Sequence, residues 1–227
     1  MIIDKILSRS INLWLRSRIS AVENLNTKVL SKDRQIIRGV IPKVLIEAGN
    51  AVYQQLYISE IKIEGTDIKV NLPQIIKKKP FKLLQPIVIK VKVLLKEEDL
   101  KKSLSSPLLS AGLTDIWNRL LSSHEIEPDR FYANYQWNDF SLSESSVYFN
   151  GISSKPEDNY EIKLSTKIQI GTTHSLLILP KSIITIPEQN LNIKRFMTVD
   201  LGDRASITYL EITSEYLSIE GTITVFP

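Results

Sequence analysis

The sequence has no cysteine, few glycines and no long apolar run, and each shortage excludes a class of protein. Without cysteine there is no disulfide framework, no thiolate nucleophile and no thiolate-bound zinc. The 8 glycines form neither G-x-G-x-x-G nor G-x-x-x-x-G-K-[ST], so the usual glycine-rich phosphate loops are missing. The longest stretch without Asp, Glu, Lys or Arg covers the 13 residues from 168 to 180. A membrane-spanning helix needs about 20 apolar residues, so none is predicted.

Histidine is also scarce, which limits the candidates for catalysis. The sequence contains only His124 and His174, and it has no G-x-S-x-G or H-E-x-x-H pattern. We therefore predict a protein that is not an enzyme and that uses no metal or other cofactor. A hydrolase or transferase remains an alternative, and it would need one histidine beside a serine or a carboxylate in a cleft.

The charge is unevenly divided along the chain, although the net value is only +4. Residues 1–102 contain 20 basic and 10 acidic side chains, a net of +10, and residues 103–227 contain 9 and 15, a net of −6. The first half is therefore expected to prefer anionic surfaces. The sequence lacks the aromatic-rich basic strand or the arginine-rich helix of common nucleic-acid modules, so no nucleic-acid partner is predicted.

The N-terminal segment predicts an amphipathic helix over about residues 2–21. Two interpretations fit it: the helix packs on the protein's own core, or it lies in a membrane interface with its cations against anionic headgroups. Charges interrupt any apolar signal segment, so we expect the helix to be retained and the protein to be cytoplasmic and peripherally membrane-associated. The apolar face carries Ile3, Leu7, Ile11 and Trp14, and the opposite face carries Lys5, Arg9, Asn12 and Arg16.

Most of the remaining chain alternates with a period of two, which predicts antiparallel strands and an α+β protein. Turns are expected at residues 48–50 and 65–67, and the clearest strand at 87–95, followed by an acidic short helix and a core helix over 107–121. We predict one domain, 1–227, with a possible internal division near 122–130. Further strands are predicted at 146–151, 160–170, 175–179, 182–186, 205–212 and 216–226.

A basic segment stands out between two of the expected strands. It consists of four lysines around one aromatic residue, and its proline keeps it from being a regular central strand. Three interpretations remain open: a solvated charge run, a contact with anionic lipid in which the aromatic ring inserts, and a nucleic-acid contact. The segment comprises Lys77, Lys78, Lys79, Phe81 and Lys82.

Six segments carry a further pattern: 25–29, 38–44, 51–61, 68–70, 91–100 and 216–223. Together with the order of the elements, they resemble the LmeA family of phospholipid-binding proteins, and within it the branch found in cyanobacteria. The resemblance implies a TULIP-like fold, in which a strongly curved antiparallel sheet wraps around a long helix and leaves an apolar groove. It also implies phospholipid binding without catalysis.

The resemblance and the residues together predict a non-catalytic phospholipid-binding protein, with roles in lipid transfer or in maintaining envelope or thylakoid membranes. The basic segment would hold the headgroup, with Phe81 as a shallow anchor, and Lys5, Arg9, Trp14 and Arg16 would add membrane contacts. The alternative is a structural or protein-interaction module that docks through its N-terminal helix. The expected lining of the acyl groove is Ile87, Ile89, Val91, Leu109, Leu113, Ile116 and Trp117.

Overall fold

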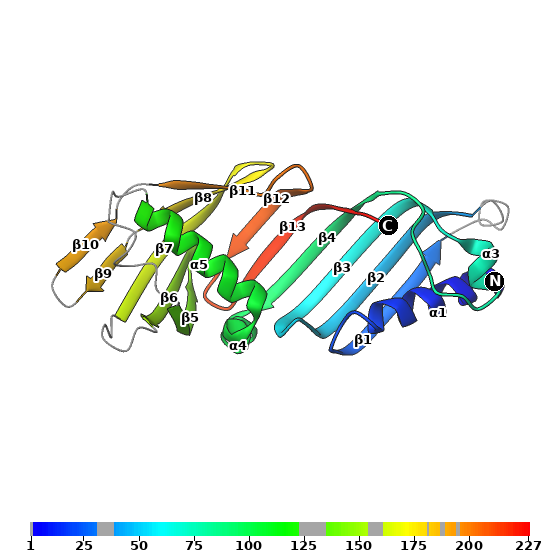
Figure 1. Ribbon diagram of the computed structural model, residues 1–227, viewed down its shortest axis with the longest axis horizontal. Coiled ribbons are helices and arrows are strands. Elements are labelled where there is room, and N and C mark those ends of the chain that lie inside the picture. Colours follow the sequence, from blue (N-terminus) through cyan, green and yellow to red (C-terminus); the bar gives the residue numbers. More distant parts are fainter. Residues whose placement is uncertain are drawn as a thin grey trace.

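The computed structural model describes residues 2–30, 39–122, 135–153, 161–180, 182–186, 189–193 and 196–227. In these residues two antiparallel sheets and a two-stranded ribbon follow one another along an elongated molecule (Figure 1). The α+β class with antiparallel sheets and an N-terminal helix is confirmed. The predicted division at 122–130 falls almost entirely outside the described residues.

The first sheet combines strands from both ends of the sequence. Its order is β1-β2-β3-β4-β13-β12, and every neighbouring pair is antiparallel. The C-terminal strands therefore complete the sheet that the N-terminal strands begin. The bounds are β1 (Ala21–Leu30), β2 (Val40–Tyr53), β3 (Leu56–Lys69), β4 (Ile87–Lys96), β12 (Ala205–Ile212) and β13 (Tyr216–Val225).

The second sheet has the order β11-β8-β7-β6-β5, and a separate ribbon pairs β9 with β10. The strands predicted in this part of the chain are confirmed, with ends that differ by a few residues at most. Their bounds are β5 (Tyr135–Ser143), β6 (Ser146–Ser153), β7 (Glu161–Thr172), β8 (Ser175–Pro180), β9 (Ser182–Ile186), β10 (Gln189–Ile193) and β11 (Met197–Asp200).

The helices are short and lie on different sheets. The N-terminal helix α1 (Ile2–Arg16) ends five residues before the predicted end, and α5 (Pro107–Ser122) matches its prediction closely. Neither sheet closes, so a sheet wrapped around one long helix is not confirmed. Among the described helices, none combines the length and apolarity needed to cross a membrane. The remaining helices are α3 (Leu72–Ile76), α4 (Glu97–Lys102) and a 3₁₀ turn, η1 (Ser103–Ser105).

Two separate hydrophobic cores lie on these helices. The α1 core joins α1 to the first sheet and the segment after it, and the α5 core joins α5 to the second sheet and the far end of the first. The buried members of the α1 core are Leu7, Ile11, Val29, Ile41, Val44, Ile68, Val70, Leu72, Ile75 and Phe81. Those of the α5 core are Leu95, Leu100, Leu113, Trp117, Leu120, Trp137, Phe140, Leu142, Val147, Phe149, Ile162, Leu164 and Ile212.

The turns predicted at residues 48–50 and 65–67 are wrong, because β2 and β3 run straight through them. Asn50 and Asp67 adopt positive φ angles of 48° and 52° inside the strands, and the pairing between β2 and β3 skips both positions. The hairpin turn lies instead at Gln54 and Gln55, which both have positive φ. A two-residue turn whose twist matches that of the flanking strands needs positive φ at both positions. Glycine-containing signals therefore marked irregular strand positions and not strand ends.

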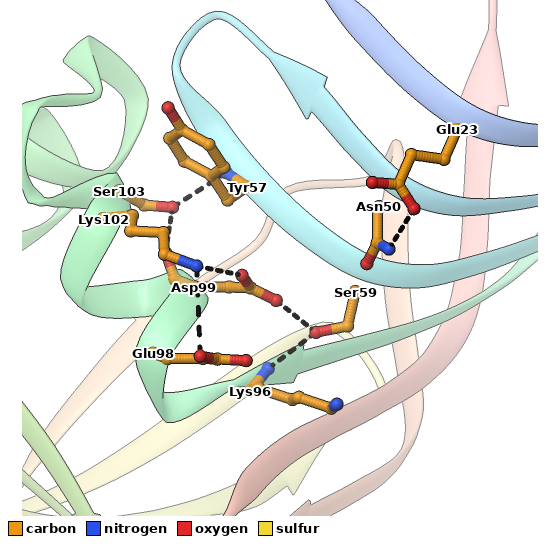
Figure 2. A network of polar contacts seen from close by, with 9 residues as sticks. All are labelled: Glu23, Asn50, Tyr57, Ser59, Lys96, Glu98, Asp99, Lys102 and Ser103. Carbon is orange, nitrogen blue, oxygen red and sulfur yellow. Dashed lines mark hydrogen bonds and ion pairs between the residues drawn. The ribbon is translucent and has the colours of Figure 1, made fainter.

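A polar network fastens α4 to the hairpin of β2 and β3 (Figure 2). The hydroxyl of Ser59 donates to Asp99 and accepts the backbone N–H of Lys96 at 3.1 Å. The Ser103 hydroxyl accepts the N–H of Tyr57 at 2.8 Å and donates to the Asp99 carbonyl at 2.6 Å. Since Ser59 and Ser103 are buried, these bonds satisfy groups that would otherwise lose water without a partner.

Glu97 connects the two sheets. Its carboxylate accepts the backbone N–H of Leu142 in β5 at 2.8 Å and forms an ion pair with Lys101 at 2.7 Å. The Leu142 hydrogen bond, followed by the one from Lys101, lowers the pKa of Glu97 below its ordinary value. A lowered carboxyl pKa means that the bond contributes stability above the unfolded pKa of about 4.3 and loses it as the pH falls.

We expect Glu97→Ala to lower the free energy of unfolding by about 1–2 kcal/mol at pH 7, because the Leu142 N–H loses a charged acceptor. Urea unfolding at pH 7 and pH 3 measures this, and the loss should shrink at pH 3. Glu97→Gln keeps an acceptor without the charge, so it should cost less than alanine at pH 7. An alanine loss of equal size at both pH values would contradict the assigned role.

Candidate functional site

The two cores cover the apolar side of β4 only near its two ends. At one end Ile87 packs on the α1 core, and at the other end Val93 and Leu95 pack in the α5 core. Between them, Ile89 and Val91 belong to neither core and are half-buried. The middle of this face therefore belongs to neither core. Figure 1 shows α1 and α4–α5 at opposite ends of the sheet.

Cross-strand pairing extends this uncovered region to the neighbouring strands. Val91 lies opposite Ile63 of β3, and Ile89 lies opposite Ile223 of β13. All of these side chains are half-buried except Ile223, which is 44% exposed. We name this set the apolar strip, and none of its members packs in either core: Ile61, Ile63, Ile89, Val91, Ile219 and Ile223.

The opposite face of the same strands is charged and carries two ion pairs. Lys43 lies 2.8 Å from Glu64, and Lys92 lies 2.6 Å from Glu220. A hollow of about 460 Å³ on this face is rimmed by such side chains. Burying an apolar ligand here would desolvate the ion pairs, whereas the apolar strip has no charged side chain to desolvate.

The structure separates the predicted groove lining into three places. Ile89 and Val91 lie on the apolar strip, but Ile87 packs on the α1 core. The α5 members of the set pack in the α5 core, which includes Val93 and Leu95 of β4 but neither Ile89 nor Val91. The set therefore does not form one continuous lining. The α5 members are Leu109, Leu113, Ile116 and Trp117, all buried or half-buried in the α5 core. Helical periodicity identified a core helix correctly but gave no information on which sheet it covers.

Sequence reasoning missed four members of the apolar strip: Ile61, Ile63, Ile219 and Ile223. Their alternation with Lys62 and with Glu220 predicts strands with one apolar side. It does not predict which part of that side a helix leaves uncovered, since this depends on contacts distant in sequence.

The basic segment is exposed at its lysines but not at its aromatic residue. Asn71 holds the segment in place, because its side chain donates to the Pro80 carbonyl at 2.9 Å and accepts the Lys82 N–H at 2.8 Å. Phe81 between them is only 9% exposed and packs in the α1 core. The prediction of Phe81 as a membrane anchor is therefore corrected.

Two apolar residues beside the lysines are exposed instead. Ile76 is 54% exposed and precedes Lys77, and Leu84 is 60% exposed and follows the segment. Lys77, Lys78, Lys79 and Lys82 are all exposed, and within the described residues no ion pair involves them. The combination of unpaired cations with flanking apolar side chains was not recognised in the sequence.

The apolar face of α1 is buried against its own sheet, as the first interpretation expected. Leu7 and Ile11 are buried, and the half-buried ring of Trp14 lies 5.8 Å from that of Phe81. This face is therefore covered, and a partner that docks on α1 would have to use its polar side. Lys5, Arg9 and Arg16 are exposed there.

The structure describes one of the two histidines that the catalytic alternative would need. His174 lies exposed in the turn between β7 and β8, and its Nδ1 is 2.9 Å from the Ala205 carbonyl oxygen. His124 lies outside the described residues. Within the described ranges, no group of three or more histidine, aspartate and glutamate side chains could hold a metal ion.

We expect Phe81→Ala to lower the free energy of unfolding by about 3 kcal/mol, because it empties a packed position beside Trp14. Leu84→Ala is the matched control from the same segment, and it should change stability by less than about 0.5 kcal/mol because Leu84 is exposed. Chemical denaturation measures both. Equal and small losses would show that Phe81 is not a core residue.

Comparisons with known proteins give one match. The model of a family described as LmeA-like phospholipid-binding matches residues 2–222 of the chain. No curated protein and no solved structure matches. The matched range takes in all of β1–β12, both cores and every residue of the apolar strip but Ile223. The chain belongs to the LmeA-like phospholipid-binding family.

Proposed function

We propose that the apolar strip holds the acyl chains of a phospholipid and that the exposed lysines after α3 meet its anionic membrane surface. The proposal rests on one observation: the two cores cover the apolar face of the first sheet only at its ends. Cores bury this face at both ends, and six aliphatic side chains between them lack such cover. Membership of the phospholipid-binding family supports a lipid as the molecule that covers them.

The energetics favour an acyl chain at this position. Each buried CH₂ contributes about 0.8 kcal/mol to the free energy of binding. Several buried methylenes would therefore offset the conformational entropy that the acyl chain loses when it binds. The strip offers no charged side chain of its own, which suits the tail and not the headgroup. The acyl chain would cover Ile89 and Val91 between the two cores.

The basic segment supports contact with a membrane surface. Its four lysines lack carboxylate partners within the described residues, so their charge is available to lipid headgroups. Each lysine near an anionic surface contributes about 1 kcal/mol. Ile76 and Leu84 replace Phe81 as the apolar residues that would enter the interface. The protein would then act without catalysis at a membrane, in lipid holding or transfer.

The decisive test compares two adjacent residues of β4 that lie on opposite faces. Ile89 belongs to the apolar strip, and Val88 is 59% exposed on the charged face. We expect Ile89→Lys to reduce the phospholipid bound per chain at least about tenfold, because an unpaired ammonium group would be buried under the tail. Native mass spectrometry of purified protein, followed by lipid extraction, measures the occupancy.

Val88→Lys is the control and should retain wild-type lipid and a wild-type melting temperature. Melting curves of both variants separate loss of lipid from loss of fold. Wild-type protein without lipid, or equal loss in both variants, would reject the apolar strip as the acyl surface.

A second variant tests the membrane surface separately. We expect replacement of Lys77, Lys78, Lys79 and Lys82 by Glu to weaken binding to phosphatidylglycerol vesicles at least about hundredfold and to leave the melting temperature nearly unchanged. Vesicle sedimentation at low and high salt measures this. Unchanged sedimentation would remove the basic segment from the proposal and leave the apolar strip unaffected.

A further inference from the structure

A hollow of about 630 Å³ lies between α1 and β1, on the side of α1 away from the apolar strip. The helix provides one wall and the outermost strand of the first sheet provides the other. We name it the edge groove. Its lining consists of Asp4, Lys5, Ser8, Arg9, Asn12, Leu13, Arg16, Thr27, Lys28, Val29 and Leu30.

The strand wall of the edge groove is part of a border strand. Four consecutive residues of β1, from Thr27 to Leu30, line it. β1 ends the strand order of the first sheet, so one edge of its backbone lies at the border of the sheet. In the described part of the chain no strand lies beside this edge. Its outward N–H and C=O groups are therefore available to an added strand.

The helix wall is mainly cationic, with Asp4 as its one acidic residue. Lys5, Arg9 and Arg16 are exposed along it, and Lys28 adds a cation from β1. None of the four takes part in an ion pair within the described residues. Lys5 and Arg16 are eleven residues apart, about 16 Å along the helix, which equals about five residues of an extended strand. One phosphate group is too small to meet both ends of this row.

Apolar side chains complete the edge groove. Leu13 is 63% exposed on the helix wall and Leu30 is 47% exposed on the strand wall. Thr27 donates to the Asn12 side chain and so holds α1 against β1. An extended segment that alternates carboxylate and apolar side chains would place carboxylates against the cations and apolar side chains against Leu13 and Leu30.

We propose that the edge groove binds an extended acidic segment of a partner protein, which adds to β1 as a further strand of the first sheet. The new strand pairs its backbone with the edge of β1, and its carboxylates lie against Lys5, Arg9 and Arg16. A groove between an edge strand and a helix is the geometry in which peptides add to sheets. This site is independent of the apolar strip, because the packed body of α1 separates the two.

A labelled ten-residue peptide that alternates Glu and Val is the probe, and fluorescence anisotropy with the full chain measures its binding. We expect saturable binding that weakens as salt rises, with slower amide hydrogen exchange in β1 on addition of the peptide. A peptide with Lys for Glu should not bind. A peptide with Pro for Val keeps the charge but cannot form the strand pairing, so it should bind at least tenfold more weakly.

Charge reversal locates the site. Lys5→Glu with Arg9→Glu should weaken peptide binding at least tenfold, and the control Lys62→Glu with Lys90→Glu, exposed on the charged face, should leave it unchanged. Three results would overturn the proposal: a folded protein that ignores the Glu–Val peptide, equal binding of the proline peptide, or equal effects of the two double variants. Loss of phosphatidylglycerol vesicle binding in the first variant, without any peptide binding, would assign the edge groove to membranes instead.

Discussion

The apolar face of the six-stranded sheet is wider than the helices that cover it. Six strands at about 4.8 Å spacing span about 24 Å, and 14-residue strands such as β3 extend about 45 Å, whereas one helix covers a band of about 10 Å. The α1 and α5 cores occupy the two ends, and the apolar strip is the remainder. The position of the apolar strip therefore follows from the size of the sheet and the shortness of the helices.

The hydrogen bonds of α4 fix the position of the α5 core relative to the first sheet. β4 leads directly into α4, whose Asp99 is bonded to the hairpin of β2 and β3 and whose Glu97 is bonded to β5. A change in this junction would move the α5 core relative to the first sheet. It would thereby alter the width of the apolar strip without touching any of its residues.

Local patterns in the sequence were sufficient for elements whose periodicity and ends are marked in their own residues. The alternation of β4 and the helical periodicity of α5 gave both elements almost to the residue. The turns failed because Asn50 and Asp67 take positive φ inside long strands, and Gln54 and Gln55 form the turn without any glycine. Phe81 failed for a different reason: the Asn71 side chain folds its segment back onto Trp14, a contact set by residues far apart in the chain.

Ion pairs between lysine and glutamate occur on one of the basic surfaces of the described residues. On the outer face of the first sheet, Lys43 and Lys92 are neutralised by carboxylates, and this face can serve solubility. Around the edge groove and after α3, cations remain without carboxylate partners in the described residues, and like charges held together raise the free energy of the unbound state. An anionic partner relieves that repulsion at each site. Because α1 stands between the apolar strip and the edge groove, one protein could then hold a lipid and a polypeptide at the same time.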